Sequence, residues 1–175
     1  MHESSTFSRT KDPFADRYEV VSSPFPFWDP HMFRDDDGRV YFYWGCSNNE
    51  PIRGVEMDPE TMHPIGEPVD LVHGRPDVHG FERIFKEGKL TNDPPFIEGV
   101  YVNKHNGKYY LQYSCPGTEF NTYGDGVYVS DKPLGPYVPH ENNPFSSKPG
   151  GFICGSGHGS TFCDMYGNWW YTGTM

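Results

Sequence analysis

The segment DPHMFRDDDGRVYFYW, residues 29–44, decides the fold class of this sequence. Its Asp37-Gly38 pair suits the tip of a tight β-hairpin, because both residue types tolerate a positive φ. The aromatic and β-branched run that follows is typical of a strand. Two later segments have the same construction, EGVYVNKHNGKYYLQY at residues 98–113 and HGSTFCDMYGNWWYT at residues 158–172. The sequence therefore predicts a series of β-hairpins.

The three segments align as an internal repeat when their hairpin glycines are superposed; these are Gly38, Gly107 and Gly167. An ionisable residue lies nine positions before each glycine: Asp29, Glu98 and His158. Cys46 and Cys115 also agree, each eight positions after its glycine. In a β-propeller the innermost strand of every blade begins near the central axis. We therefore expect the three ionisable residues to converge at one mouth of the axial channel. The alternative is that three β-hairpins share a length by chance and that these are ordinary polar residues at the starts of strands.

Composition supports an all-β protein and excludes several classes of function. The chain has 175 residues, and 14 basic against 24 acidic side chains give a formal charge of −10. This balance disfavours nucleic acid and anionic membranes as partners, because both require a basic face. The mean hydropathy is −0.72, and no apolar run is long enough to predict a membrane-spanning helix. The 20 glycines and 17 prolines indicate many turns.

We expect a β-propeller with about three blades in this chain. The expected limits are residues 1–20 for the tail of an earlier blade, then about 21–90, 91–150 and 151–175 for successive blades, the last incomplete. Propellers close with about four to eight blades, so the chain is expected to be a piece of a longer protein. An incomplete propeller could also self-associate through its open ends.

The four cysteines have two possible structural roles. Cys46, Cys115, Cys154 and Cys163 could form two disulfides, but their spacing is not that of a small disulfide-rich scaffold. Nor do Cys154 and Cys163 form the paired Cys-x-x-Cys of a structural zinc site. We expect all four to be small buried thiols.

Carboxylates that face one another across a channel suit the hydrolysis of glycosidic bonds. One acid protonates the leaving oxygen, and one carboxylate activates water or attacks the sugar directly. Aromatic side chains could offer faces for sugar rings or could pack inside the blades; the candidates are Trp28, Phe33 and Tyr123. His158 follows a glycine-rich approach, so its imidazole could bind a central cation or water, or be a hydrogen-bonded channel histidine.

Four motifs between residues 20 and 175 resemble those of family 43 glycoside hydrolases and occur in the same order as in that family. The first is WDPHMF at residues 28–33, which runs into DDDGRVY. The next are IEG at residues 97–99, leading to NGKYYL, and KPLGPY at residues 132–137, followed by NPF. The last is GSGHGS at residues 155–160. The resemblance implies a five-bladed β-propeller and inverting hydrolysis, usually of β-xylosides or α-L-arabinofuranosides in plant cell-wall polysaccharides such as arabinoxylan.

The resemblance also implies a role for each matching residue. Glu98 matches the general acid, and Asp29 matches the aspartate that tunes the pKa of the acid and orients it. His158 matches the histidine at the propeller centre, which in the family often lies near a bound calcium or other ion. The reaction itself requires no cofactor. The motif Glu98-Gly99-Val100 departs from the proline that many members carry after this glycine.

The general base of the family belongs to the first blade, and it has no match here. Asp12 and Asp16 fall where the outer part of that blade is expected. An acid without a base hydrolyses poorly, so the chain alone is expected to be inactive unless another segment supplies the base. The alternative is a propeller that binds carbohydrate without cutting it. Residues 1–5 lack the features of a secretory signal. The longer protein to which the chain is expected to belong should nevertheless be secreted or periplasmic if it degrades polysaccharides.

Overall fold

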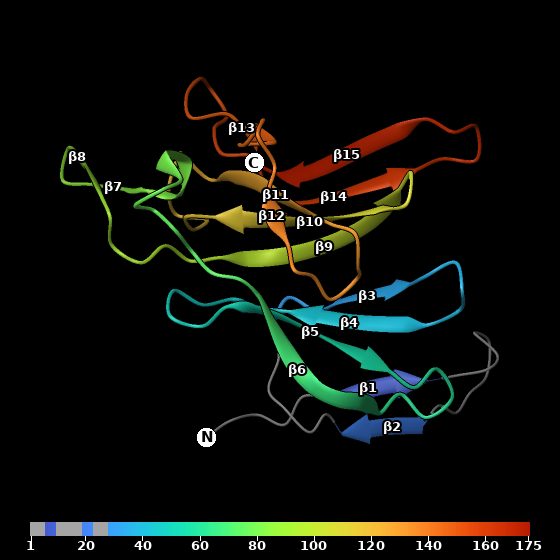
Figure 1. Ribbon diagram of the computed structural model, residues 1–175. Helices are drawn as coiled ribbons and strands as arrows, with labels where there is room; N and C mark the ends of the chain where they lie inside the picture. The colour runs from blue at the N-terminus through green and yellow to red at the C-terminus, as the bar shows by residue number, and fades with distance from the viewer. Residues whose placement is uncertain (1–5, 10–18, 23–27) are drawn as a thin grey trace.

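A computed structural model describes residues 6–9, 19–22 and 28–175 of the chain. It is built from antiparallel β-sheets that lie side by side (Figure 1). The first large sheet contains, in order, β3 (His31–Arg34), β4 (Val40–Trp44), β5 (Ile52–Met57) and β6 (Pro64–Val72). The second has the order β12-β11-β10-β9, with β13 also paired to β11; the bounds are Glu98–His105 for β9, Lys108–Cys115 for β10, Gly124–Ser130 for β11, Val138–Pro139 for β12 and Ser146–Ser147 for β13.

Three smaller units complete the described structure. A third blade begins with the hairpin of β14 (Gly157–Cys163) and β15 (Trp169–Thr174). The long connection between the two large sheets holds the hairpin of β7 (Ile84–Lys86) and β8 (Lys89–Thr91), and the 3-10 turn η1 (Gly80–Glu82). β1 (Thr6–Arg9) pairs with β2 (Glu19–Ser22). The rest of the segment expected to be the tail of an earlier blade, including Asp12 and Asp16, lies outside the described residues.

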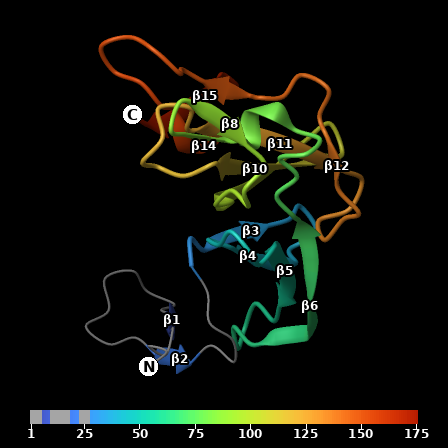
Figure 2. The same cartoon turned by 90° about the vertical axis from the view of Figure 1, so that its left-hand side faces the viewer.

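The all-β propeller architecture predicted from the sequence is confirmed. A four-stranded and a five-stranded antiparallel sheet follow one another along the chain, and the turned view shows them stacked as successive blades (Figure 2). The predicted hairpin glycines Gly38, Gly107 and Gly167 all have positive φ, of 88°, 75° and 85°. Within the described residues η1 is the one helical element, and none is long and apolar enough to cross a membrane.

The blades pack through alternating faces of their strands. All five residues of β4 are buried, because both faces of its sheet are covered. Tyr41 and Tyr43 join a core shared with the second sheet, where they meet residues such as Leu111. The other face of β4 packs in a separate cluster with Val55 and Met57. Because successive side chains of a strand point to opposite faces of the sheet, β4 contributes to one interface between the blades and to a second cluster on the opposite side of the first sheet.

A buried ion pair links the first hairpin tip to the second blade. Asp35 is 5% exposed and accepts hydrogen bonds from Lys104 Nζ and, at 2.5 Å, from Tyr109 OH. Burial alone would raise the pKa of Asp35, but these hydrogen bonds outweigh it and lower the pKa. The acidic run 35–37 is therefore a hairpin tip with one side chain turned inward.

Replacing Lys104 by methionine should destabilise the protein by about 3 kcal/mol, because it leaves the Asp35 carboxylate buried without its cation. The measurement is the free energy of unfolding in urea at pH 7. Lys108→Met is the matched control, since Lys108 pairs with Asp131 at an exposed position and surface pairs contribute about 1 kcal/mol or less. Equal losses for the two variants would contradict the role given to the buried pair.

His31 is a second link between the blades, and its titration gives the fold a pH dependence. Its Nε2 donates to the carbonyl oxygen of Val102 at 3.1 Å, and its ring lies 4.2 Å from that of Tyr101. Burial lowers the pKa of His31 to about 4, although the hydrogen bond to Val102 opposes the change. The folded protein therefore holds a neutral imidazole at pH values where the unfolded chain is protonated.

Stability should fall as the pH is lowered from about 6.5 to about 4, because the unfolded state then binds the proton that folded His31 excludes. The full difference is worth up to about 3 kcal/mol. Urea unfolding of wild type and His31→Gln at pH 4, 5, 6 and 7 checks this, with the exposed His63→Gln as control. The slope should flatten only in His31→Gln; an unchanged slope would contradict the assignment.

The expectation of four buried thiols is wrong for two of them. All four cysteines are free; Cys115 is buried in the core and Cys46 is half-buried. Cys154 and Cys163 are exposed. Cys154 lies in the loop before β14, and Cys163 ends that strand at the hairpin, where no neighbouring blade covers it in the described residues.

Candidate active site

The structure brings together the three ionisable residues that share a register in the repeat. Asp29 lies just before β3, Glu98 begins β9, and His158 is the second residue of β14. One carboxylate oxygen of each acid and one ring nitrogen of the histidine all lie within 4.8 Å of one another. The three strands are the innermost of their blades, and β9 contacts both β3 and β14. The cluster therefore lies where successive blades meet.

The backbone around the cluster takes an uncommon conformation. Asp29 and His158 both have a φ of 49°, in the left-handed region that few residues other than glycine occupy. Gly99 has a φ of 60°, and its N–H donates to Asp29 Oδ2 at 3.1 Å. A Cβ at Gly99 would lie 3.0 Å from the Cγ of His158 and 3.1 Å from Ser114 Oγ. The absence of a side chain at Gly99 thus leaves room for His158 of the third blade and for Ser114.

Both carboxylate oxygens of Glu98 accept a hydrogen bond. Tyr123 OH donates to Oε1 at 2.6 Å, and the Cys46 thiol donates to Oε2 at 3.3 Å. Burial, helped by the hydrogen bond to Glu98, raises the pKa of Cys46 to about 12, so the thiol keeps its proton. Burial likewise raises the pKa of Tyr123. Glu98 is only 9% exposed, and these two donors fix its orientation.

A buried polar network holds the backbone of His158 in place. The His158 N–H donates to Ser114 Oγ at 2.6 Å, and Ser114 in turn donates to Asp125 Oδ1 at 2.5 Å. Asp125 is fully buried and also accepts from Gln112 and Tyr171. Burial raises the pKa of Asp125, and its hydrogen bonds oppose that change. The network joins the second and third blades and contacts the cluster through the His158 amide.

The three aromatic candidates for sugar binding have different surroundings. Trp28 is 71% exposed and precedes Asp29. Tyr123 lies at the cluster but uses its hydroxyl to hold Glu98. Phe33 is half-buried and packs against the core, edge-on to Tyr109 with ring centroids 6.1 Å apart, and its contact with sugar stays a prediction. Phe33 lies four residues beyond Asp29, where the strand faces the next blade.

The cluster is a poor match for a calcium ion. Calcium takes roughly six to eight oxygen ligands, whereas the cluster offers two carboxylates and one imidazole. Both oxygens of Glu98 already accept hydrogen bonds from Tyr123 and Cys46. His158 is exposed, so it is free to meet a ligand or water.

The distance between the two acids indicates that they do not act as an acid and a water-activating base. Inverting glycosidases separate those two carboxyl groups by roughly 6.5–9.5 Å to leave room for the water. The oxygens of Asp29 and Glu98 lie within 4.8 Å, and Asp29 is tied to the Gly99 amide beside Glu98. Asp29 and Glu98 therefore lie too close together for that pair of roles.

If the cluster hydrolyses glycosides, as the resemblance to family 43 implies, Tyr123→Phe should lower kcat about tenfold while KM changes less than twofold, because it removes a hydrogen bond that orients Glu98. The measurement is steady-state hydrolysis of an aryl glycoside. Tyr166→Phe, at an exposed hairpin tip, is the control. An unchanged kcat in Tyr123→Phe would remove Tyr123 from this role.

An aromatic cavity of about 480 Å³ lies apart from the cluster. It opens between the sheet of β9–β13 and the β14–β15 hairpin, and Trp169, Trp170 and Tyr171 are among its lining residues. None of the three clustered residues lines it. Size alone therefore does not locate the chemistry of this protein.

Comparison with known proteins identifies a single family. The model of glycosyl hydrolases family 43 matches residues 6–173. A beta-xylosidase of Xylanibacter ruminicola is 28% identical over 149 residues, which cover 74% of this chain and 44% of that protein. An arabinoxylan arabinofuranohydrolase of Paenibacillus polymyxa is 31% identical over 153 residues, covering 82% and 22%. The chain thus spans less than half the length of these curated relatives.

Solved structures give the same match. A thermostable family-43 glycoside hydrolase superposes with a TM-score of 0.72 at 28% identity, covering 91% of this chain and 53% of that one. An endo-1,4-beta-xylanase from Bacteroides thetaiotaomicron superposes with a TM-score of 0.67 at 27% identity, covering 89% and 56%.

Proposed function

Because the chain belongs to glycosyl hydrolase family 43, we propose that the protein hydrolyses glycosidic bonds of plant cell-wall saccharides at the cluster of Asp29, Glu98 and His158. The observation that carries this proposal is the largely buried Glu98, held by two donors within reach of a second acid and an exposed imidazole. The substrates we propose are β-xylosides and α-L-arabinofuranosides, which the names of similar proteins support.

In the proposed reaction Glu98 is the general acid. Its carboxyl proton passes to the glycosidic oxygen while the bond between that oxygen and the anomeric carbon breaks. Water attacks the anomeric carbon from the opposite face and loses its proton to a general base, which we assign to no described residue. Asp29 orients the start of β9 through the Gly99 amide. His158 is placed to contact the sugar or a bound water.

The molecule that the protein binds in this proposal is a carbohydrate, and the reaction needs no cofactor. We further propose that the protein acts outside the cytoplasm, because polysaccharide substrates are too large to enter a cell. Copies of the 175-residue chain could self-associate through exposed aromatic side chains of the third blade, such as Trp170; size-exclusion chromatography tests this separately.

A carbohydrate-binding propeller is the second candidate function. The same cluster could hold a sugar without cleaving it, and the absence of an assigned base among the described residues favours this reading. Both candidate functions predict that the protein binds a sugar, but only the glycosidase predicts that the glycosidic bond is cleaved.

The test is hydrolysis of an aryl β-xyloside and an aryl α-L-arabinofuranoside by the protein at its full natural length. Release of the aryl group from either substrate supports the glycosidase. Saturable binding of xylose or arabinose with no release from any substrate would instead assign the binding function.

A further inference from the structure

The two oxygens of the Glu98 carboxylate have hydrogen-bond partners of unequal strength. Tyr123 OH donates to Oε1 at 2.6 Å, whereas the Cys46 thiol donates to Oε2 at 3.3 Å. We propose that the catalytic proton leaves from Oε2, and that Cys46 is a positioning residue whose weak donor leaves this oxygen free to take the proton. The inference rests on the proposed function, because it takes Glu98 as the general acid.

The pairing of the backbone places Cys46 opposite Glu98. Ser47 and Ile97 form an antiparallel bridge, and each donates its N–H to the carbonyl oxygen of the other, at 3.2 and 3.1 Å. The next pair along such a bridge is Cys46 and Glu98, at a position where antiparallel side chains approach most closely. The contact between the thiol and Oε2 is therefore fixed by the pairing that joins the first two blades, although 52 positions separate its residues.

The two donors differ in how firmly they hold their oxygens. A thiol is a weak hydrogen-bond donor, whereas a phenol hydroxyl is an ordinary one. Burial raises the pKa of Tyr123, so this hydroxyl keeps its proton and Oε1 remains an acceptor. Burial and the hydrogen bond to Glu98 raise the pKa of Cys46 to about 12, so the thiol stays neutral. A proton on Oε1 would weaken the stronger hydrogen bond, whereas a proton on Oε2 displaces only the weaker one.

The two oxygens also differ in access. The hydrogen bond from Tyr123 is buried, and Tyr123 itself is 3% exposed. Cys46 is half-buried, so the Oε2 side of the carboxylate is the more open one. The charge of Asp29 also contributes to the raised pKa of Cys46, which places the thiol near both acids of the cluster. A general acid must lie within hydrogen-bond reach of the leaving oxygen, and the more open Oε2 side suits that approach.

The proposed step moves one proton and breaks one bond. The proton on Oε2 passes to the glycosidic oxygen while the bond from that oxygen to the anomeric carbon breaks, and the electron pair of this bond stays with the oxygen. Glu98 is then a carboxylate, and the Cys46 S–H donates to Oε2 in the arrangement that the structure shows. Solvent returns a proton to Glu98 before the next cycle. The thiol transfers neither a proton nor an electron.

The kinetic test replaces the thiol by a stronger donor and by no donor. The measured quantity is kcat/KM for a xylo- or arabino-oligosaccharide divided by kcat/KM for the matching glycoside of an acidic phenol, which needs little protonation. Cys46→Ser should lower this ratio about fivefold, because a hydroxyl holds Oε2 as an acceptor more firmly than a thiol does. Cys46→Ala should keep or raise the ratio. Cys154→Ser, at an exposed position, is the matched control and should leave it unchanged.

The order of the two variants separates the proposal from a purely structural role of Cys46. If the thiol only filled space or oriented Glu98, serine would be tolerated better than alanine, because serine keeps a donor of similar size. A ratio for Cys46→Ser at or above the ratio for Cys46→Ala would therefore overturn the proposal and leave Glu98 as the general acid.

A spectroscopic test needs no turnover, so it separates failure of this inference from failure of the proposed function. The S–H stretching band of Cys46 is isolated as the infrared difference between wild type and Cys46→Ala. It is followed through the protonation of Glu98 at pH values where the protein stays folded. A shift to the higher wavenumber of an unpaired thiol supports a proton on Oε2, even if the wild type hydrolyses nothing. A band that stays fixed while Glu98 takes its proton would overturn the proposal, and the buried Cys115 thiol is the control that should not shift.

Discussion

Replacing Glu98 by glutamine should lower kcat/KM for oligosaccharides by about 10²–10⁴-fold, the usual contribution of a positioned general acid. Glutamine keeps the shape of the side chain and can still accept from Tyr123 or Cys46, but it has no proton to give to the leaving oxygen. Binding of the sugar should therefore persist. The measurement is hydrolysis of xylo- and arabino-oligosaccharides by the protein at its full natural length.

A series of leaving groups makes this prediction specific. An aryl glycoside with a very acidic phenol needs little protonation, so Glu98→Gln should lose much less activity on it than on an oligosaccharide. Glu141→Gln, an exposed position after β12, is the matched control and should behave as wild type. Equal losses on good and poor leaving groups would contradict the assignment of Glu98 as the acid.

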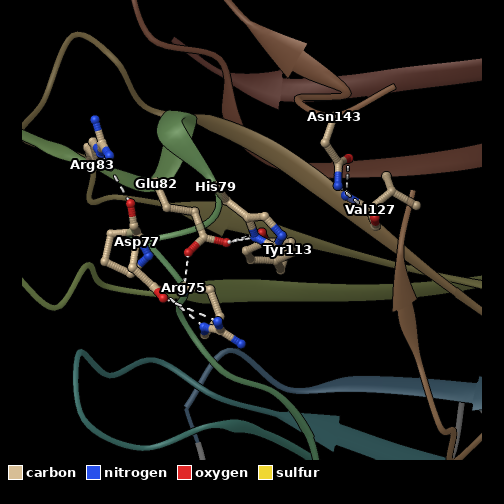
Figure 3. A network of polar contacts seen from close by, with 9 residues as sticks. Arg75, Asp77, His79, Glu82, Arg83, Tyr113, Val127 and Asn143 are labelled. Carbon is tan, nitrogen blue, oxygen red and sulfur yellow. Dashed lines mark hydrogen bonds and ion pairs between the residues drawn. The ribbon is translucent and has the colours of Figure 1, made fainter. Parts of the chain in front are cut away.

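Replacing Glu82 by leucine should destabilise the protein by about 3 kcal/mol or more. The change leaves the donors of Arg75, His79 and Tyr113 without their common acceptor in a buried place. Each buried donor that loses its partner costs about 1–3 kcal/mol. The free energy of unfolding in urea gives the measurement, and Figure 3 shows the contacts that would be lost.

Glu82→Gln is the control for this change, because glutamine retains one acceptor oxygen at the same place. It should cost clearly less than Glu82→Leu. If the leucine variant were as stable as wild type, the segment of residues 73–83 would owe its position to packing alone, and the polar network would be incidental.

The sequence predicted which ionisable residues cluster better than it predicted their surroundings. Gly38, Gly107 and Gly167 mark hairpins of equal length, so counting back from them located Asp29, Glu98 and His158 at equivalent strand starts. Such a register is visible in one sequence because a propeller repeats its blades along the chain.

The supporting contacts could not be predicted because they join segments that are distant in the chain. Cys46 meets Glu98 across 52 positions, and the His158 amide meets Ser114 across 44. The repeat did contain one usable signal, since Cys46 occupies the same register as buried Cys115. The packing of Phe33 against the core could not be predicted either, because an aromatic residue near a site is indistinguishable in sequence from one that packs between blades.

The most direct test of the central claim is the NMR spectrum of the first sugar released from an aryl β-xyloside or α-L-arabinofuranoside. The account predicts that the anomeric proton of the new product first shows the configuration opposite to that of the substrate, as direct attack by water requires. Release of the sugar with its original configuration would contradict the mechanism. Saturable binding without any released sugar would assign the site to carbohydrate binding alone.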